Sequence, residues 1–581
     1  MSTTVRQFLR GVWKTAANAN EKTGVNVALS GEQNHKRVLV IGLDGATFDL
    51  IRPLVNKGKM PNLARMGAEG ISTELRSTIL PLSPPAWTTF LTGKNPGGHG
   101  IYDFAKRVEG TYDFAPTTSM DMRSRAIWNA IEAQGGSSIL VNVPLTYPPA
   151  SFRGFMLSGF PTPTERRDYT YPPGLLQELE KEFGSVNIHK PKVLYKKGRE
   201  REITDETLAI TKQQTLVTKY LMGRIDWSLT VSVYDATDVL GHYFWAYLDP
   251  GHPKYDKRLA KEVEQMVEDI HVSLDEAIGE MTNAVGEDTL KVVMSDHGFG
   301  PVYYGVYVNN WLVSENYMKF KKTIRVRAKH FAFRNGLNVY NMLRVARRLG
   351  LVKSIESAYA TRSYAIRLLN MISLGFQDVD WGKTRVYSAG NMGQLYLNLV
   401  GREPGGIVKP EEAGPLVYEL IGKIKGLQDP ANGRTMFDMV FAGREIYSGP
   451  FSANGPDVIF LDQKMVYAAH RMFELGSNSL VTLHPIYSGN HKMDGILFAE
   501  GRGVTPGSKP ESKPNLVDLA PTILCYLGLR VPGEMEGQVI SELSGGAPEV
   551  VQGQESQRVN SAIREILSKK SRSGLGASTS R

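Results

Sequence analysis

The chain has 581 residues, of which 41% are hydrophobic, and its formal net charge is +9 at pH 7. Ordinary glycine and proline usage excludes collagen-like and low-complexity chains, and the single cysteine, Cys525, excludes an internal disulfide framework. No apolar stretch reaches the ~18 residues that a membrane-spanning helix needs, so a large globular protein is expected.

Residues 1–36 lack a strand pattern and are expected to form an N-terminal tail. Part of this tail would place five apolar side chains on one helical stripe: Val5, Phe8, Leu9, Val12 and Trp13. That pattern is typical of a short helix lying in a membrane interface, although a frayed tail or a helix docked on the core also fits it. No apolar run precedes a small-residue cleavage site, so no secretory signal is expected and the chain is predicted to be cytoplasmic.

Four continuous apolar runs predict buried strands of a parallel sheet. They are Val38–Leu43, Ser138–Pro144, Leu229–Tyr234 and Leu290–Ser295. Helical patterns such as Leu63–Ala68 and Leu259–Glu280 lie between them. Strands alternating with helices predict a doubly wound α/β fold, with a mostly parallel sheet and helices on both faces. Ligand sites in such folds form beyond the carboxyl ends of the strands.

One domain is expected to span residues 37–545, followed by a polar, partly disordered tail at 546–581. Two cap-like insertions are predicted within the domain, at about 165–225 and about 303–385. The first is charged and mostly helical, and the second continues from an aromatic-rich start into a basic helical segment.

Positive charge is concentrated in the second insertion. Between Lys319 and Arg367 there are thirteen Lys or Arg residues against one acid, Glu356, so the rest of the chain sums to −3. We expect an anionic partner there, either a membrane surface at the inner face of the membrane or a polyanionic substrate. Nucleic acid is not expected, because no recognised binding motif accompanies the charge.

Residues of metal-ligating types follow three of the predicted strands, and one more histidine occurs late in the chain. They are Asp44, Asp238, His242, Asp296, His297 and His491. Asp238 and His242 are four residues apart, so a helical turn would place both on one face. Asp296 and His297 are adjacent and can converge only in a loop past the strand. Three carboxylates and three imidazoles suit two divalent ions, with zinc favoured and manganese as the alternative.

The segment from Leu80 to Phe104 is similar to the nucleophile region of nucleotide pyrophosphatases and phosphodiesterases of the alkaline phosphatase superfamily. In that family a Thr or Ser precedes a helix that ends in Thr-Gly and is followed by Pro-x-x-His-Gly-Ile. Counting back from Gly93 places Ser83 at the nucleophile position. The order of further motifs along roughly residues 37–540 also resembles that family: Gly42–Gly45, Met60–Leu63, Asp238–His242, Ser295–Gly298, His491 and Pro514–Gly528.

Three further segments resemble a prokaryotic branch described as predicted phosphohydrolases or phosphomutases: Ser158–Pro163, Asn310–Leu312 and Leu397–Ile407. The resemblance implies an alkaline phosphatase-like fold with helical cap insertions. It also implies a two-metal hydrolase of a phosphate ester, with a phosphodiester or nucleotide pyrophosphate favoured. Small-molecule and lipid phosphate esters both belong to this substrate class.

The resemblance further implies how the roles divide. One ion would be held by Asp238, His242 and His491. The other would be held by Asp44, Asp296 and His297, with the Ser83 oxygen as a further ligand. Ser83 would attack phosphorus, because metal coordination lowers the pKa of its hydroxyl, and water would hydrolyse the phospho-Ser83 intermediate. Free amides at the start of a helix would favour the phosphoryl oxygens.

Departures from the family pattern leave alternatives open. A sulfatase of the same fold needs Cys/Ser-x-Pro-x-Arg, but Trp87 stands where the Arg is required, which argues against that activity. Phe104 stands where pyrophosphatases carry an Asn that donates to the phosphoryl group. A phosphomonoesterase or phosphomutase acting on a phosphosugar is therefore the alternative, since cofactor-independent phosphoglycerate mutases use a Ser with a similar ligand set.

Two positions are weak candidates for substrate contacts, Arg402 and Phe104, although Arg402 fits a surface position equally well. His99 is expected to order its loop rather than bind metal. A function of another class is a membrane-surface binding protein with a degenerate hydrolase core. The complete set of ligand types and the serine nucleophile argue against this alternative.

Overall fold

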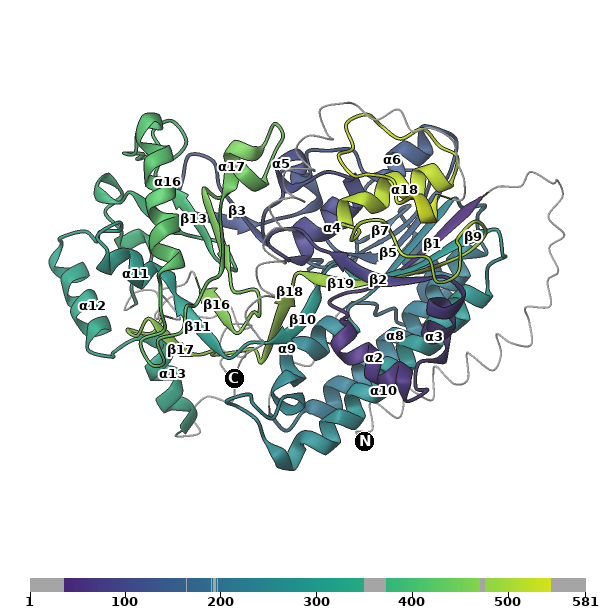
Figure 1. Ribbon diagram of the computed structural model, residues 1–581, viewed down its shortest axis with the longest axis horizontal. Helices are drawn as coiled ribbons and strands as arrows, with labels where there is room; N and C mark the ends of the chain where they lie inside the picture. Colours follow the sequence, from purple (N-terminus) through teal and green to yellow (C-terminus); the bar gives the residue numbers. More distant parts are fainter. Residues whose placement is uncertain are drawn as a thin grey trace.

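A computed structural model describes residues 36–163, 165–189, 191, 195, 197–348, 373–470 and 476–544. Two lobes lie side by side: a sheet lobe, with the large central sheet, and a second lobe with smaller sheets (Figure 1). The predicted interfacial helix, the tail at 546–581 and the part of the basic insertion at 349–372 fall outside the described residues.

The sheet lobe is built on an eight-stranded sheet with the order β2-β19-β9-β1-β8-β5-β6-β7. Its strands are β1 (Arg37–Leu43), β2 (Ile71–Arg76), β5 (Ser138–Val143), β6 (Gly154–Ser158), β7 (Thr170–Tyr171), β8 (Leu229–Tyr234), β9 (Thr289–Met294) and β19 (Asp494–Glu500). The strands from β9 to β6 pair in parallel, whereas β19 and β7 pair antiparallel with their neighbours. The strands predicted from the sequence are β1, β5, β8 and β9, so the mostly parallel α/β sheet is confirmed.

Both faces of the sheet are covered by helices, because consecutive side chains of a strand point to opposite faces. In β1, Leu39, Ile41 and Leu43 enter one core, and Val38 and Val40 enter the other. The first core includes α2 (Phe48–Asn56), α3 (Pro61–Glu69), α7 (Leu175–Phe183), α8 (Glu200–Met222), α9 (Ala236–Leu248) and α10 (Lys257–Asn283). The second includes α4 (Ser83–Thr92), α6 (Ile127–Glu132) and α18 (Leu519–Tyr526). Among the helices in the described ranges, none combines the length and the hydropathy needed to cross a bilayer.

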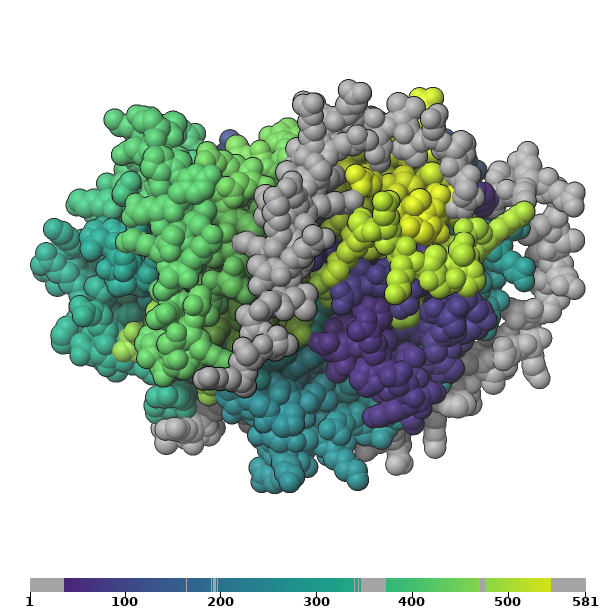
Figure 2. Space-filling model, in the orientation of Figure 1, coloured from purple at the N-terminus to yellow at the C-terminus, as the bar shows by residue number. Residues whose placement is uncertain are grey.

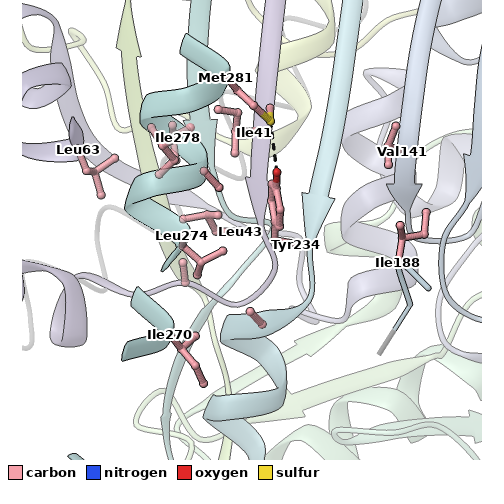
Figure 3. Packing of buried hydrophobic residues seen from close by; sticks show 14 of the residues in the cluster. Ile41, Leu43, Leu63, Val141, Ile188, Tyr234, Ile270, Leu274, Ile278 and Met281 are labelled. Atoms are coloured by element: carbon pink, nitrogen blue, oxygen red, sulfur yellow. Dashed lines mark hydrogen bonds between the residues drawn. The ribbon is translucent and has the colours of Figure 1, made fainter. Parts of the chain in front are cut away.

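Helix α10 shows how the first core is held together. Its apolar residues recur every three to four positions, and Leu274, Ile278 and Met281 are completely buried. Leu274 lies close to Leu43 of β1, and the Met281 sulfur lies 3.2 Å from the Tyr234 hydroxyl at the end of β8 (Figure 3). Each such buried side chain contributes about 1.5–3 kcal/mol. This packing fixes the strand ends from which the polar residues continue.

The insertion predicted at about 165–225 lies against the sheet. It contains the edge strand β7 and the helices α7 and α8, and its Leu176, Val217 and Leu221 belong to the same core as β1. Helix α8 also packs along α10 and β8. Because its apolar residues are shared with the central strands, this segment is a layer of the sheet lobe.

The chain builds the second lobe between β10 (Gly298–Pro301) and β18 (Gly489–Lys492). The strands of its two sheets, in chain order, are β11 (Tyr304–Tyr307), β12 (Val386–Ser388), β13 (Gln394–Leu397), β14 (Met439–Ala442), β15 (Val458–Leu461), β16 (Tyr467–His470) and β17 (Val481–Leu483). Its longer helices are α11 (Val308–Ser314), α12 (Ile324–Arg334), α13 (Val339–Arg348) and α16 (Pro410–Lys425). The lobe, teal to green in Figure 2, extends beyond the insertion predicted at about 303–385, because strands from later in the chain complete its sheets.

Candidate active site

Three neighbouring strands of the central sheet end in polar residues at one edge. Asp44 follows β1, Asp238 lies in the first turn of α9 after β8, and Asp296 and His297 lie in the loop after β9. Because β8, β1 and β9 are adjacent and parallel, their carboxyl ends bring these side chains together. All four residues are buried, with at most 2% of each exposed.

The turn after β1 is shaped by two glycines. A Cβ atom at Gly42 would lie 2.5 Å from the indole of Trp87, so the absence of a side chain lets that ring pack on the strand. The indole Nε1 donates to Asp44 Oδ2 at 3.1 Å. Gly45 has a φ of 71°, a left-handed conformation that glycine adopts without strain, and its N–H donates to Asp296 Oδ1 at 3.2 Å.

Asp238, His242 and His491 form the first group of ligand-type side chains. Helix α9 carries Asp238 and His242 one turn apart, with Asp238 Oδ1 3.2 Å from His242 Nε2. His491 comes from β18, which pairs antiparallel with β10. Its Nε2 lies 3.2 Å from His242 Nε2 and 3.5 Å from Asp238 Oδ1. The structure therefore brings together the three residues that the resemblance assigns to one ion.

Asp44, Asp296 and His297 form the second group, with Ser83 beside it. His297 Nε2 lies 3.2 Å from Asp296 Oδ2, 3.6 Å from Asp44 Oδ1 and 3.3 Å from Ser83 Oγ. The ligand atoms of this group lie within 4.8 Å of one another, and the same is true of Asp238, His297 and His491. His297 thus lies between the two groups, whereas the family resemblance implies that it belongs to one of them.

Backbone carbonyl groups fix the tautomer of all three histidines. The distances from Nδ1 to the carbonyl oxygen are 3.1 Å for His297 and Gly298, 2.8 Å for His491 and Pro81, and 3.3 Å for His242 and Gly489. A carbonyl oxygen only accepts, so each Nδ1 carries the ring proton. Each neutral ring then presents the lone pair of Nε2 to the carboxylates, which is the arrangement of metal-ligating histidines.

Burial makes this cluster electrostatically unfavourable without added positive charge. It raises the pKa of Asp296 well above its ordinary value and lowers the pKa of His297 and of His491. No donor within the described ranges forms a hydrogen bond to the buried Asp296 Oδ2. This carboxylate oxygen lies next to imidazole lone pairs that face each other. A cation would stabilise such an arrangement. The residues present therefore fit divalent metal ions.

Ser83 is the first residue of α4, a helix whose ten residues are all buried. Free amides are predicted at this helix end, but the next two residues are Pro84 and Pro85, which have no N–H. The N–H of Ala86 already bonds to the Leu82 carbonyl at 3.0 Å. Ser83 does lie at the start of a helix, as expected, but among the described residues of this helix end only the Ser83 N–H is left to bind an anion.

His99 is completely buried, like His297, but its ring proton lies on the other nitrogen. The N–H of Ile101 donates to His99 Nδ1 at 3.2 Å, so the ring proton lies on Nε2, which donates to Thr89 Oγ1 at 3.0 Å. Burial lowers the pKa of His99 to about 3, which keeps the ring neutral. Nε2 joins the loop to α4, Nδ1 accepts a hydrogen bond within the loop, and no lone pair is left for a metal, in agreement with the structural role expected.

Arg402 lies in the second lobe, where its guanidinium makes five hydrogen bonds. The acceptors are the carboxylates of Glu403 and Asp457 and the carbonyl groups of Leu397 and Ala453. A guanidinium has five N–H donors, so none is left for a substrate, and Arg402 stabilises the second lobe instead. Phe104 packs edge-on against Phe160, with ring centres 5.9 Å apart, and offers a phosphoryl group no donor.

Several groups that hold the ligands were not identified from the sequence. Besides the Trp87 indole, the Thr237 hydroxyl donates to the Asp44 carbonyl at 2.6 Å. The carbonyl groups that orient the histidines leave no mark in a sequence. Trp87, four residues after Ser83, and Thr237, directly before Asp238, were visible signals, since a polar aromatic or hydroxyl group beside a ligand is a common outer support.

A family model described as type I phosphodiesterase / nucleotide pyrophosphatase matches residues 38–360, which is more than half of the chain. The match includes Ser83 and all the ligand-type residues of the cluster except His491. No curated protein matches the sequence.

Solved structures of two kinds of enzyme are similar in fold. Phosphonoacetate hydrolase from Sinorhizobium meliloti 1021, in complex with phosphonoacetate, is 13% identical over 84% of this chain and 94% of that chain, with a TM-score of 0.48. Human ectonucleotide pyrophosphatase / phosphodiesterase 5 is 12% identical over 86% of this chain and 96% of that chain, with a TM-score of 0.44. The inactive murine counterpart in complex with AMP has the same identity and coverage and a TM-score of 0.45. Nothing about this chain's substrate follows from likenesses at this level.

Proposed function

The chain belongs to the type I phosphodiesterase/nucleotide pyrophosphatase family, and on this premise we propose that it is a two-metal hydrolase of phosphate esters with Ser83 as nucleophile. A phosphodiester or nucleotide pyrophosphate is the favoured substrate class. The observation that carries the proposal is the convergence of three Nε2 lone pairs with buried carboxylates beside the Ser83 hydroxyl.

Two divalent ions are proposed, and a ligand set of imidazoles and carboxylates favours zinc, with manganese as the alternative. Asp238, His242 and His491 would hold one ion. Asp44, Asp296 and His297 would hold the other, next to the Ser83 oxygen. When bound, the ions supply positive charge that lowers the pKa of the Ser83 hydroxyl and stabilises charge on the attacking and leaving oxygens.

Ser83 Oγ is the proposed attacking atom. Its bond to phosphorus forms while the bond to the leaving oxygen breaks; Oγ loses its proton to solvent, and the leaving oxygen takes a proton from water. Water then attacks the phosphorus of phospho-Ser83 and loses a proton to solvent; the bond to Oγ breaks, Oγ takes a proton from solvent, and the phosphate product leaves. The buried α4 holds Oγ in place, and Trp87 on the same helix holds Asp44.

A second candidate activity is favoured by the scarcity of neutral donors around Ser83. Two prolines follow it, and Phe104 stands where the family carries an Asn donor. A phosphate monoester carries more negative charge than a diester, so it depends less on neutral donors and more on the metal ions. A phosphomonoesterase or phosphomutase acting on a phosphosugar is therefore the alternative, with a hydroxyl in place of water in the mutase.

The experiment is an assay of the metal-loaded full-length protein with three substrates: a nitrophenyl nucleotide diester, nitrophenyl phosphate and a radiolabelled sugar monophosphate. The diester is expected to be hydrolysed fastest, and acid quenching is expected to trap phosphate on the peptide that contains Ser83. Thr88→Val is the control for the trapping experiment. The Thr88 hydroxyl donates to the Pro84 carbonyl within α4 at 2.7 Å, so its removal should leave the trapped phosphate unchanged.

Two results would change the assignment. Transfer of the label to another hydroxyl of the sugar, with little free phosphate, would show the mutase instead. If no phosphate ester is hydrolysed by protein whose metal content has been verified, the hydrolase proposal fails and a binding protein with a degenerate hydrolase core takes its place.

A further inference from the structure

Helix α12 in the second lobe is apolar on two sides. Val326 and Phe333 pack into the core of the lobe. Ile324 and Phe331 are seven residues apart, and therefore on one face two turns apart, but they point to solvent, with 87% and 73% of each residue exposed. A surface helix normally has one apolar side, so the outward side of α12 requires a separate explanation.

The exposed apolar side chains continue beyond α12. Among the described residues, eleven large hydrophobic side chains are exposed, and five of these lie between Ile324 and Val345: Ile324, Phe331, Leu337, Met342 and Val345. We call them, together with the basic residues around them, the α12–α13 surface. Such a concentration on a globular protein marks an interaction site.

Basic residues are interleaved with these apolar residues in the sequence. Residues 319–348 contain ten Lys or Arg residues and no Asp or Glu. Lys322, Arg327, Arg334 and Arg344 are exposed, and no acidic side chain of the described ranges forms a salt bridge with any of them. The charge is therefore available to an anionic partner.

A cavity of about 720 Å³ lies between α11, α12 and the segment that joins them. Three lysines and two arginines line it: Lys319, Lys321, Lys322, Arg327 and Arg334. Apolar residues such as Met318 and Phe333 also line it, and none of its lining residues is acidic. A cavity with basic and apolar walls suits an amphiphile with an anionic head group.

We propose that the α12–α13 surface docks on an anionic lipid bilayer. The exposed apolar side chains would enter the interface, and the lysines and arginines would lie among the lipid phosphates. The isoleucine and phenylalanine that project from α12 favour lipid over nucleic acid, which binds basic surfaces mainly through its phosphates. Helix α12 lies at the end of the second lobe farthest from the central sheet, at the left in Figure 1, and α13 lies at the lower side of the same lobe, so a membrane can reach this surface.

The test is sedimentation of the full-length protein with vesicles, which needs no turnover and is independent of the proposed hydrolase activity. Vesicles of equal parts phosphatidylglycerol and phosphatidylcholine are expected to bind the protein, and phosphatidylcholine vesicles are not. Binding should fall steeply as salt rises to ~1 M, where the Debye length is about 3 Å.

Two pairs of variants locate the contact. Phe331→Ser should weaken binding roughly tenfold, whereas Met120→Ser, at an equally exposed residue (73%) of the sheet lobe, should not. Arg327→Glu combined with Arg334→Glu should weaken binding at least about tenfold. Lys261→Glu, at an exposed lysine on α10, is the charge control.

Several outcomes overturn the inference. They are no binding to anionic vesicles at low salt, equal binding by the paired variants, and loss of binding only when residues 1–35 are deleted. Binding to an oligonucleotide but not to vesicles would assign the surface to nucleic acid. Conversion of a dimer to a monomer by Phe331→Ser, without vesicle binding, would assign it to a second copy of the chain.

Discussion

The second lobe and the edge of the central sheet bury carboxylates beside different partners. In the second lobe, Lys329 Nζ lies 3.0 Å from Asp378, and the two side chains are only 7% and 8% exposed. Arg402 lies 2.6 Å from Asp457 in a second, largely buried pair. These two buried acids are thus neutralised by cations of the chain itself.

At the sheet edge, imidazole lone pairs take the place of such cations. Asp296 Oδ2 lies 3.2 Å from His297 Nε2, and the Nε2 atoms of His242 and His491 lie 3.2 Å apart. An uncompensated buried charge costs several kcal/mol, and the second lobe shows that this chain can supply a cation where one is needed. This contrast supports the proposal that the sheet edge receives its positive charge from metal ions in solution.

The largest expected effect tests whether this edge carries the chemistry. Ser83→Ala should lower turnover at least roughly a thousandfold, because no other hydroxyl is expected to replace the nucleophile. Steady-state kinetics would measure the loss, and elemental analysis should show unchanged metal content. Turnover close to that of the wild type would show that another residue is the nucleophile and that Ser83 has no part in the chemistry of the sheet edge.

Metal removal tests the sheet edge directly. The loaded protein should contain two divalent ions per chain, and chelation should lower its free energy of unfolding by about 4 kcal/mol for each site held at a thousand times its Kd. Elemental analysis of His491→Gln should show the loss of one ion, whereas His99→Gln should keep both. A larger loss of metal in the His99 variant would contradict the tautomers described above.

Arg402→Met tests the second lobe. It leaves Glu403 and Asp457 largely buried with less positive charge, so the free energy of unfolding should fall by about 3 kcal/mol, measured by denaturant titration. Metal content and KM should stay unchanged, because all five donors of Arg402 are used within the lobe. A raised KM without loss of stability would indicate that Arg402 contacts the substrate.

Trp87→Phe is expected to have the smallest effect. It removes the hydrogen bond to Asp44 and also the indole atoms nearest Gly42, Cη2 and Cζ2, so metal affinity should fall roughly 10- to 100-fold. Metal titration by calorimetry would measure this change, with Trp128→Phe in α6 as the control, since that indole lies in the same core away from the ligands. Equal affinities in the two variants would show that Asp44 does not need its indole partner.

Much of the sheet edge could be predicted from the sequence. Continuous apolar runs identify central strands, and parallel strands must end at a common edge, so Asp44, Asp238 and Asp296 are placed by physical rules alone. The roles of Ser83 and His491 depended on the family resemblance, because neither follows a central strand. The hydrogen-bonding of Trp87 was missed, since its partner is decided by tertiary packing around Gly42.

The second lobe was predicted less well for a physical reason. Its strands are three or four residues long, as in Val386–Ser388, so their apolar periodicity is too short to recognise. Their partners are distant in sequence, as for Tyr304 and Tyr467. The full use of Arg402's donors likewise emerges only after those strands have paired.

The position of His491 after the whole second lobe has a consequence for biosynthesis. His297 leaves the ribosome before that lobe is made, whereas His491 follows it, on the strand that pairs back with β10. At roughly 5–20 residues per second, the interval between the two histidines lasts about 10 to 40 s. A nascent chain therefore presents an incomplete cluster throughout that time, and the proposed metal sites can be completed only after the second lobe has been made.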